Sequence, residues 1–324
     1  MTQESTQERP LVTFALFAYN QEKYIREAIE GAFAQTYEPL EIILSDDCST
    51  DRTFEIMKSV ADQYNGPHKL YVRKNEHNLG IAAHFDLVMR KAQGDLVVVA
   101  AGDDVSMPDR ASISAQAFLN DKTIGCFEGA CINFSGELPD IKSSSGSAFE
   151  MQSFSVEDVF DGNAPRLIGA SRAYVRSKYT SYSSLMTDCP AEDTPALFRS
   201  IYGSKGMYLQ VPMVLRRIHE NNLSGIESLR SMDFGVMEAQ YFRDLEEARE
   251  KRIIDEVCFK SLGLALKGYL FRKRLRIEVY DGFSRDLSII DVLVSRFVSK
   301  REKLRCLKKW LEFKKNKWLM GFRL

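Results

Sequence analysis

Apolar runs and helical repeats alternate along the first third of the chain. Four short apolar segments predict buried strands, at 11–17, 40–44, 69–73 and 96–100. Between them, apolar residues recur at three- and four-residue steps, which predicts amphipathic helices over 25–33, 51–64 and 81–92. Strands that alternate with helices of this length pair in parallel through right-handed crossovers. The pattern therefore predicts an α/β fold with a mostly parallel central sheet flanked by helices.

The pattern becomes mixed in the second half of the chain. The serine-rich stretch Ser143–Ser147 predicts a flexible loop. A helix is expected at Asp193–Tyr202 and a short strand at Tyr208–Leu215, and Gly225 is a suitable end for this domain. We therefore expect three parts: a disordered N-terminus (1–9), an α/β domain (10–225) and a helical C-terminal region with a basic amphipathic tail (226–324).

Composition adds a charge asymmetry to this picture. The 324 residues are 44% hydrophobic and 27% charged, as in ordinary globular proteins. The net charge is −1, but residues 296–324 hold 11 basic and 2 acidic side chains, a balance of +9, which leaves −10 for residues 1–295. The six cysteines show no C-x-x-C spacing, which favours free thiols over a disulfide framework.

The sequence also bears on location. The first ten residues are polar and show no signal peptide. No apolar run reaches the roughly 18 residues that a membrane span needs. We therefore expect a cytoplasmic protein, either soluble or peripheral at the inner face of the plasma membrane.

Pairs of acidic residues follow two of the predicted strands. Asp46-Asp47 comes after 40–44, and Asp103-Asp104 comes after 96–100. Open α/β sheets bind ligands at the carboxyl ends of their strands. A carboxylate there can bond a base or ribose, or hold Mg²⁺ or Mn²⁺ with phosphate and water on the remaining positions. Capping of a turn or of the next helix is the alternative for each pair.

No glycine-rich phosphate loop of the G-x-G-x-x-G or G-x-x-x-x-G-K-[ST] type occurs in the sequence. A bound diphosphate would therefore depend on a metal. A third acidic pair, Glu192-Asp193, opens a predicted helix, where an ionised carboxylate is stabilised and can act as a general base, or can serve only as a helix-start acid. His219 is a candidate ligand for metal or phosphate, although a lone histidine is more often structural.

Six segments, in the correct order over roughly residues 10–225, resemble glycosyltransferase family 2, inverting enzymes with the GT-A fold. They are Phe17–Ile25 (FAYNQEKYI), Ser45–Thr53 (SDDCSTDRT, against D-D-x-S-x-D-x-T), Asn78–Ala82 (NLGIA, against N-x-G), Ala101–Arg110 (AGDDVSMPDR, the D-x-D region), Glu192-Asp193 and Arg217–Ser224 (RIHENNLS, against R-x-H-x-x-N-x-S). Many members have an aspartate at the position of Ala101. Either Asp103 or Asp104 is then open as the metal ligand, and we favour Asp104.

The resemblance implies a GT-A nucleotide-sugar-binding fold and an inverting transfer of a sugar from a nucleotide-diphosphate sugar, with UDP favoured. The acceptor would be a hydroxyl of a saccharide or lipid-linked saccharide, in cell-surface polysaccharide or lipopolysaccharide assembly. The implied catalytic base is Asp193, with Glu192 beside it, and the implied cofactor is Mn²⁺ or Mg²⁺. The implied nucleotide-sugar contacts are Ala18, Tyr19, Asn20, Asp46, Asp47, Asn78, Gly80 and Asp103, and the implied metal ligands are Asp104, Asp103 and His219.

Two alternatives remain open at this point: a nucleotidyltransferase with a similar core, and a non-catalytic sugar- or lipid-binding module on a degenerate transferase scaffold. Nucleic-acid binding is not expected, because the excess of basic over acidic residues is confined to the tail and the body is acidic. From Ile289 to Trp318 apolar residues recur at helical steps among lysines and arginines. Such a helix suits an anionic membrane surface, and it suits packing on the acidic body of the protein equally well.

Overall fold

The computed structural model describes residues 9–140, 150–220, 222, 230, 232–280 and 288–321. The predicted loop at Ser143–Ser147, the domain end at Gly225 and residues 1–8 of the predicted N-terminus lie outside the described residues. The strands are β1 (Val12–Ala18), β2 (Leu40–Asp46), β3 (Lys69–Lys74), β4 (Leu96–Ala101), β5 (Val105–Ser106), β6 (Ile124–Phe134), β7 (Met151–Phe154), β8 (Ala173–Val175) and β9 (Lys205–Arg217).

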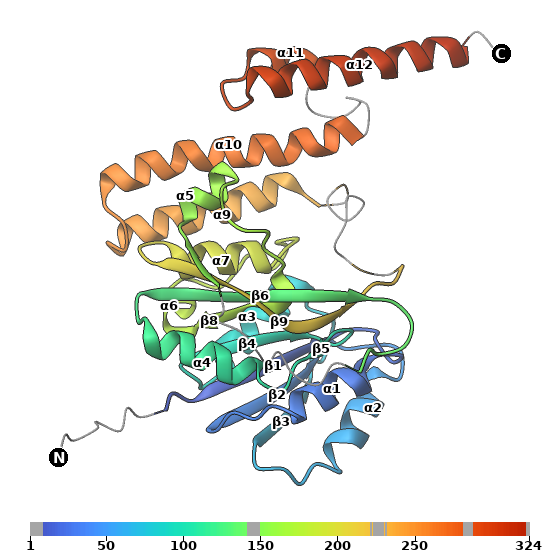
Figure 1. Ribbon diagram of the computed structural model, residues 1–324, viewed down its shortest axis with the longest axis vertical. Coiled ribbons are helices and arrows are strands. Elements are labelled where there is room, and N and C mark those ends of the chain that lie inside the picture. Colours follow the sequence, from blue (N-terminus) through green and yellow to red (C-terminus); the bar gives the residue numbers. More distant parts are fainter. Residues whose placement is uncertain are drawn as a thin grey trace.

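The described helices extend along the whole chain (Figure 1). They are α1 (Ile25–Phe33), α2 (Thr53–Ala61), α3 (Ile81–Lys91), α4 (Arg110–Asn120), α5 (Val156–Asp161), α6 (Arg176–Thr180), α7 (Asp193–Ile201), α9 (Phe234–Glu250), α10 (Glu256–Tyr280), α11 (Ile289–Val294) and α12 (Lys300–Gly321), with a 3₁₀ turn η1 (Gly169–Ser171). The strands and helices expected in the first third of the chain are all present, with ends shifted by a few residues.

One mixed sheet forms the centre of the protein. Its order is β3-β2-β1-β4-β8-β6-β9-β5, and β7 pairs with β9 beside this path. The first four strands in this order are parallel, as the alternation of strands and helices predicts. The strand β8 is antiparallel to both β4 and β6, while β6 and β9 are parallel. The result is the mostly parallel α/β sheet that the sequence predicts.

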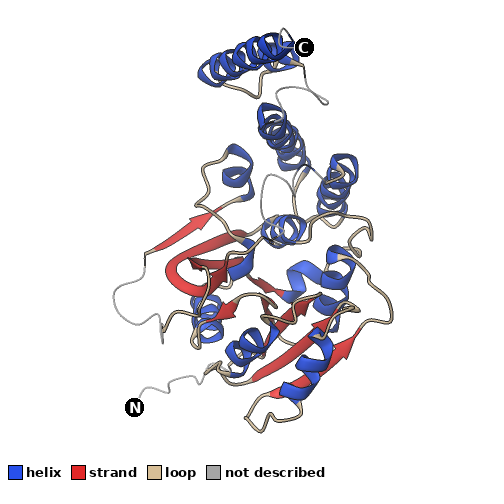
Figure 2. Ribbon diagram, turned by 90° about the vertical axis from the view of Figure 1, so that its right-hand side faces the viewer, coloured by secondary structure: helices blue, strands red, loops and turns tan. Residues whose placement is uncertain are grey.

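Helices lie on both faces of the sheet (Figure 2), and successive side chains of the central strands enter two separate cores, one on each face. On β1, Phe14 and Leu16 pack with α1, α2 and α4, while Ala15 packs on the opposite face with α3 and α7. Because both faces are covered, β1 and β2 are buried along nearly their whole length. Their apolar residues therefore form continuous runs instead of alternating with polar ones.

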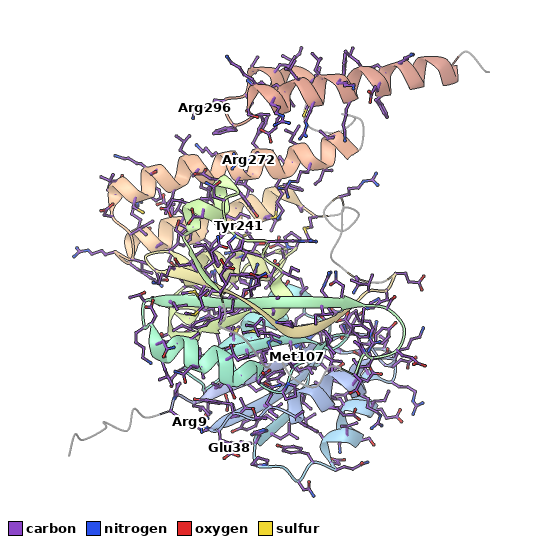
Figure 3. The ribbon with its side chains drawn as sticks, viewed as in Figure 1. Arg9, Glu38, Met107, Tyr241, Arg272 and Arg296 are labelled. Atoms are coloured by element: carbon purple, nitrogen blue, oxygen red, sulfur yellow. The ribbon has the colours of Figure 1, made fainter. Side chains whose placement is uncertain are left out.

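The helices that follow the sheet share one of these cores. Met237, Tyr241 and Leu245 of α9 and Leu262 and Leu266 of α10 belong to the same buried cluster as the helix face of α3 and α7. Figure 3 shows Tyr241 in this layer, between the sheet and α10. The division at residue 225 stays a prediction, but burial joins α9 and α10 to the sheet domain.

The last two helices pack through a smaller cluster. Cys306 of α12 lies with Val292, Val298 and Leu275, which connects α11 and α12 to α10. Figure 1 shows the pair at the end of the molecule that lies away from the sheet. Among the helices that the structure describes, none is both long and apolar enough to cross a membrane.

Candidate functional site

The carboxyl ends of β2, β1 and β4 lie side by side and carry the two acidic pairs. Ala18 of β1 is in register with Asp46 of β2, and Phe17 is in register with Ala101 of β4. The Asp47 amide donates to the Ala18 carbonyl (2.9 Å), and the Gly102 amide donates to the Phe17 carbonyl (2.8 Å). The two acidic segments therefore flank the end of β1 at one edge of the sheet.

Asp46 shapes the turn that follows β2. Its carboxylate is fully buried and accepts hydrogen bonds from the Ser49 amide (2.9 Å) and the Ser49 hydroxyl. Lys74 Nζ lies 3.9 Å from the same group. The local bonding explains this acid without a ligand, so its predicted nucleotide contact stays a prediction.

The Asp47 carboxylate connects the turn after β2 to residues 75–80, a segment that is distant in the sequence. Its carboxylate accepts from Asn75 Nδ2 (2.6 Å), the Leu79 amide (2.9 Å) and the Gly80 amide (3.1 Å). Gly80, at the start of α3, has φ of +78°, which favours glycine. Asn78 Oδ1 accepts from the same Gly80 amide (2.8 Å). Thus Asp47, Asn78 and Gly80, predicted separately, form one cluster beside β1.

The turn after β1 is held against the turn after β2. Asn20 adopts φ of +52°, its amide donates to Ser49 Oγ (2.9 Å), and its side-chain oxygen accepts from the Thr50 amide (2.9 Å). This arrangement leaves the neighbouring Tyr19 side chain 44% exposed at the sheet edge. An exposed ring in this place offers a surface for stacking a nucleotide base.

Asp103 and Asp104 point to different partners. Asp104 is buried and accepts from the Arg217 amide (2.9 Å). Burial, together with the neighbouring Asp103, raises the pKa of Asp104 to about 7. Asp103 Oδ2 instead lies 3.0 Å from His219 Nε2, and both side chains retain 14% exposure. The metal-ligand role that the sequence predicts for Asp104 stays a prediction, and Asp103, the other candidate, is the acid that faces His219.

The fit to a divalent cation rests on this pair. Among the residues that the structure describes, no cluster of three or more His, Cys, Asp or Glu side chains could hold a metal ion. Two adjacent protein ligands are nevertheless what Mg²⁺ or Mn²⁺ commonly takes when phosphate and water complete its coordination. The imidazole of His219 suits Mn²⁺ better than Mg²⁺, which prefers oxygen ligands.

Arg217 organises this part of the site, and the sequence reasoning gave it no role of its own. Its guanidinium donates to the Gly136 carbonyl (3.1 Å) and the Asp103 carbonyl (3.3 Å) and pairs with Glu27. It also lies 4.8 Å from the ring centre of Tyr24, on which His219 stacks at 4.9 Å. Arg217 opens the Arg217–Ser224 motif, but no pattern in the sequence predicts these contacts.

The third acidic pair reaches the same edge of the sheet through Arg172. The Arg172 carbonyl accepts from the amide of Val99 in β4 (3.1 Å), and its guanidinium donates to the Asp193 carbonyl (2.8 Å). Asp193 begins α7, and its side chain is 41% exposed. Glu192 is half-buried, and burial together with Asp193 raises its pKa to about 8. The base role predicted for Asp193 stays a prediction.

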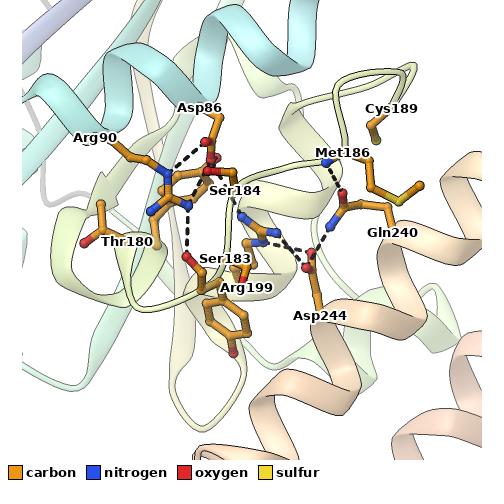
Figure 4. A network of polar contacts seen from close by, with 12 residues as sticks. Asp86, Arg90, Thr180, Ser183, Ser184, Met186, Cys189, Arg199, Gln240 and Asp244 are labelled. Carbon is orange, nitrogen blue, oxygen red and sulfur yellow. Dashed lines mark hydrogen bonds and ion pairs between the residues drawn. The ribbon is translucent and has the colours of Figure 1, made fainter.

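The segment before Glu192 is held by a buried polar network (Figure 4). Arg199 of α7 forms a two-pronged ion pair with Asp244 of α9 (2.8 and 2.6 Å). Asp244 also accepts from Gln240 (2.7 Å), whose oxygen accepts from the Met186 amide (2.8 Å). Asp86 of α3 accepts from Tyr179 and Arg90 on the other side. Helices α3, α7 and α9 therefore fix the segment that leads to Asp193.

Two surface hollows lie away from this edge. One, of about 600 Å³, is lined by residues that include Arg9 and Glu38, and the other, of about 340 Å³, by residues that include Arg272 and Arg296 (Figure 3). Neither contains a predicted site residue. The candidate site is therefore defined by the acids at the sheet edge.

The fold and this set of acids define the class of protein: an α/β protein of the GT-A type, which binds nucleotide sugars. More particularly, the chain belongs to glycosyl transferase family 2, whose family model matches residues 13–180. This membership agrees with the resemblance seen in the motifs and disfavours a nucleotidyltransferase.

Relatives and solved structures support the assignment. The uncharacterized protein Rv1520 of Mycobacterium tuberculosis is 38% identical over 114 residues, which are 34% of this chain and 32% of that protein. Chondroitin synthase of Pasteurella multocida is 32% identical over 117 residues, 36% of this chain and 12% of that protein. The match thus spans about a third or less of the length of these two relatives.

The fold similarity extends over more of the chain. The crystal structure of S. aureus TarS has a TM-score of 0.58 at 16% identity and covers 87% of this chain and 76% of that one. The mannosyltransferase PcManGT of Pyrobaculum calidifontis, solved with GDP-Man and Mn²⁺, has a TM-score of 0.53 at 15% identity and covers 97% and 88%. These likenesses establish the GT-A fold.

Proposed function

We propose that the protein transfers a sugar from a nucleotide-diphosphate sugar to a hydroxyl of a saccharide or lipid-linked saccharide, with inversion at the anomeric carbon, in the assembly of a cell-surface polysaccharide or lipopolysaccharide. The observation that carries the proposal is the connection of Asp103 and Asp193 to the same strand, β4. One acid follows the end of the strand, and Arg172 holds the other beside it. Family membership supports the same activity.

Each end of the reaction has its own residues. Asp193 accepts the proton of the acceptor hydroxyl, whose oxygen attacks the anomeric carbon as the bond from that carbon to the diphosphate oxygen breaks. General base catalysis of this kind contributes about 10²–10⁴-fold to a rate. Tyr19 and the cluster around Asp47 bind the nucleoside, because they lie beside the end of β1. UDP is the favoured nucleotide, and TarS, a fold neighbour, was solved with UDP-GlcNAc.

A divalent cation, preferably Mn²⁺, supplies charge neutralisation for the departing diphosphate when it is bound. Asp103 and His219 are the proposed ligands. Asp104 accepts a hydrogen bond from the Arg217 amide and so helps to hold the segments that carry these two ligands. The raised pKa of Asp104 agrees with a supporting role, because burial and the negative charge of the neighbouring Asp103 both oppose ionisation of the Asp104 carboxyl.

The substitution Asp193→Asn tests the proposal. A thermal-shift screen of UDP-GlcNAc, other UDP-sugars and GDP-Man with Mn²⁺ first selects the donor, and release of nucleoside diphosphate measures turnover. We expect the variant to bind the donor as the parent does and to lose about 10²–10⁴-fold in turnover. Full turnover in Asp193→Asn would exclude this base. Donor binding without any turnover by the parent would instead favour the non-catalytic module.

We also propose that α12 holds the enzyme on an anionic membrane surface, where a lipid-linked acceptor would be found. One face of the helix packs toward α10 through Cys306. Another face exposes Leu304, Lys308, Leu311 and Lys315 at helical steps, and the two leucines are 68% and 53% exposed. Apolar side chains flanked by lysines suit an anionic lipid surface.

Flotation with phosphatidylglycerol and phosphatidylcholine vesicles tests the membrane proposal. We expect the parent to float only with the anionic vesicles and Leu304→Gln/Leu311→Gln to lose most of this binding. Val257→Gln, at a 79% exposed apolar residue of α10, is the matched control and should bind as the parent does. Equal binding by the leucine double variant would remove the proposal.

A further inference from the structure

A buried charge pair lies behind the proposed base. Arg172 is 4% exposed, and its Nε donates to Oε2 of the fully buried Glu128 in β6 (2.7 Å). The other carboxylate oxygen of Glu128 accepts from the Ile168 amide. Burial alone would lower the pKa of Arg172, but Glu128, Tyr174 and Asp193 act together in the opposite direction, and this pKa lies well above its ordinary value. Arg172 is therefore a fixed cation.

The Nη1 nitrogen of the Arg172 guanidinium faces Asp193. Arg172 Nη1 donates to the Asp193 carbonyl (2.8 Å) and lies 3.7 Å from the carboxylate atom Oδ2. Gly169, just before Arg172, leaves the space that the carboxylate fills: a Cβ built there would lie 2.8 Å from Asp193 Oδ2. Thr194 Oγ1 donates to the remaining oxygen (3.1 Å). Arg172 and Gly169 thus lie on the same side of Asp193, where Arg172 places a positive charge near its carboxylate and Gly169 leaves room for it.

We propose that Glu128 and Arg172 form a positioning pair that orients Asp193 and sets the charge that this base faces. The inference rests on the proposed role of Asp193 and deepens it. A cation within about 4–6 Å favours the ionised form of a carboxylate, whereas Glu128 reduces the net charge that Arg172 presents. The two members of the pair therefore act on Asp193 in opposite directions.

Other titratable groups also face Asp193. They are Glu192 of α7, Tyr174 of β8, Tyr241 of α9, and Tyr269 and Lys273 of α10. The tyrosines are neutral near neutral pH, because burial raises the pKa of each. Arg172 also lowers the pKa of Tyr174, Glu192 and Tyr269, so the shift in the pH profile is assigned to the pair from Glu128→Gln, which leaves Arg172 in place.

Three variants test the inference in the full-length protein with UDP-GlcNAc, or the donor found in the screen, at saturating Mn²⁺. Glu128→Gln keeps the shape and removes the opposing charge, so the acidic limb of kcat/KM should move to lower pH. Glu128→Gln/Arg172→Met removes both charges, which avoids an unpaired buried ion, and the limb should move to higher pH by about 1 unit or more. Arg172→Lys keeps the charge but not the fork, so turnover should fall with little movement of the limb.

The outcomes separate the inference from the proposed function. If Asp193→Asn abolishes turnover but the acidic limb stays in place in both Glu128 variants, the pair has only a structural role and the inference is wrong. If both variants move the limb in the same direction, the opposition of charges is also wrong. If Asp193→Asn retains turnover, the base assignment itself fails. Thermal unfolding of each variant shows that the profile is measured on folded protein, and Glu128→Gln alone suffices if the double variant does not fold.

Discussion

His84 is a buried histidine behind the nucleotide side of the site, and it should make the protein less stable in acid. Its Nε2 lies 2.6 Å from Ser45 Oγ, and its Nδ1 lies 4.0 Å from Asp47 Oδ2. Burial lowers its pKa from 6.5 to about 4, although Asp47 acts in the opposite direction. The folded protein therefore holds this imidazole neutral at pH values where the unfolded chain protonates it.

The sign and size follow from linkage between protonation and folding. As pH falls from about 6.5 to about 4, the unfolded state gains a proton that the folded state does not, so unfolding becomes easier. At about 1.36 kcal/mol per pKa unit, the gap between 6.5 and about 4 limits the loss to about 3 kcal/mol. Between pH values of about 7.5 and 4.5, about 2.5 kcal/mol of this loss should be seen.

Urea unfolding of the parent and of His84→Gln, followed by far-UV circular dichroism, measures the effect. The variant keeps a polar group near Ser45 and cannot be charged. We expect the difference in unfolding free energy between the two proteins to shift by about 2.5 kcal/mol in favour of the variant on going to pH 4.5. The exposed His77, substituted as His77→Gln, is the control and should show no such shift. A difference that is the same at both pH values would refute the reasoning.

Three further predictions concern the surroundings of the acids. Asp244→Ala removes the carboxylate that pairs with the buried Arg199 and leaves Asp86 at 3.9 Å from the guanidinium. The free energy of unfolding in urea should therefore fall by about 3–5 kcal/mol, whereas it should fall much less in Arg199→Met/Asp244→Leu, which removes both charges. Equal losses in the two variants would contradict this. Gly169→Ala should displace the Asp193 carboxylate and reduce turnover by about 10²-fold with donor KM unchanged, while Gly263→Ala, whose nearest neighbour atom is 3.9 Å away, should leave turnover intact. Asp103→Asn should raise the Mn²⁺ concentration needed for half-maximal donor binding more than Asp104→Asn does, and calorimetry with the reverse order would return the ligand role to Asp104.

The two halves of the sheet differ in how far their strands can be predicted from the sequence. Strands β1, β2 and β4 were predictable because they are buried on both faces and therefore read as short apolar runs. Strand β6 was not predicted, because its second half is only partly buried and its pairing with β9 contains register shifts. Strand β8 has only three residues, which is too short for any periodicity, yet it lies between β4 and β6 in the sheet and pairs with both.

The sequence also does not predict which partner each of two neighbouring aspartates has. Asp46 and Asp47 are neighbours of one residue type, but one closes its own turn and the other binds the 75–80 segment. Asp103 and Asp104 differ in the same way, since one faces His219 and the other the amide of Arg217. No local pattern distinguishes the members of these pairs, because their partners come from segments far along the chain.

By itself, the sequence determined the alternation of strands and helices, the family and the set of acids, because these depend on the spacing of apolar residues and on short motifs. Only the tertiary structure decided which carboxylates are buried, which partners they have, and that Glu128 and Arg172 lie behind Asp193. The physical reason is that desolvation and charge pairing depend on distances between atoms across the fold, and Glu128 is separated from Asp193 by more than sixty residues of chain.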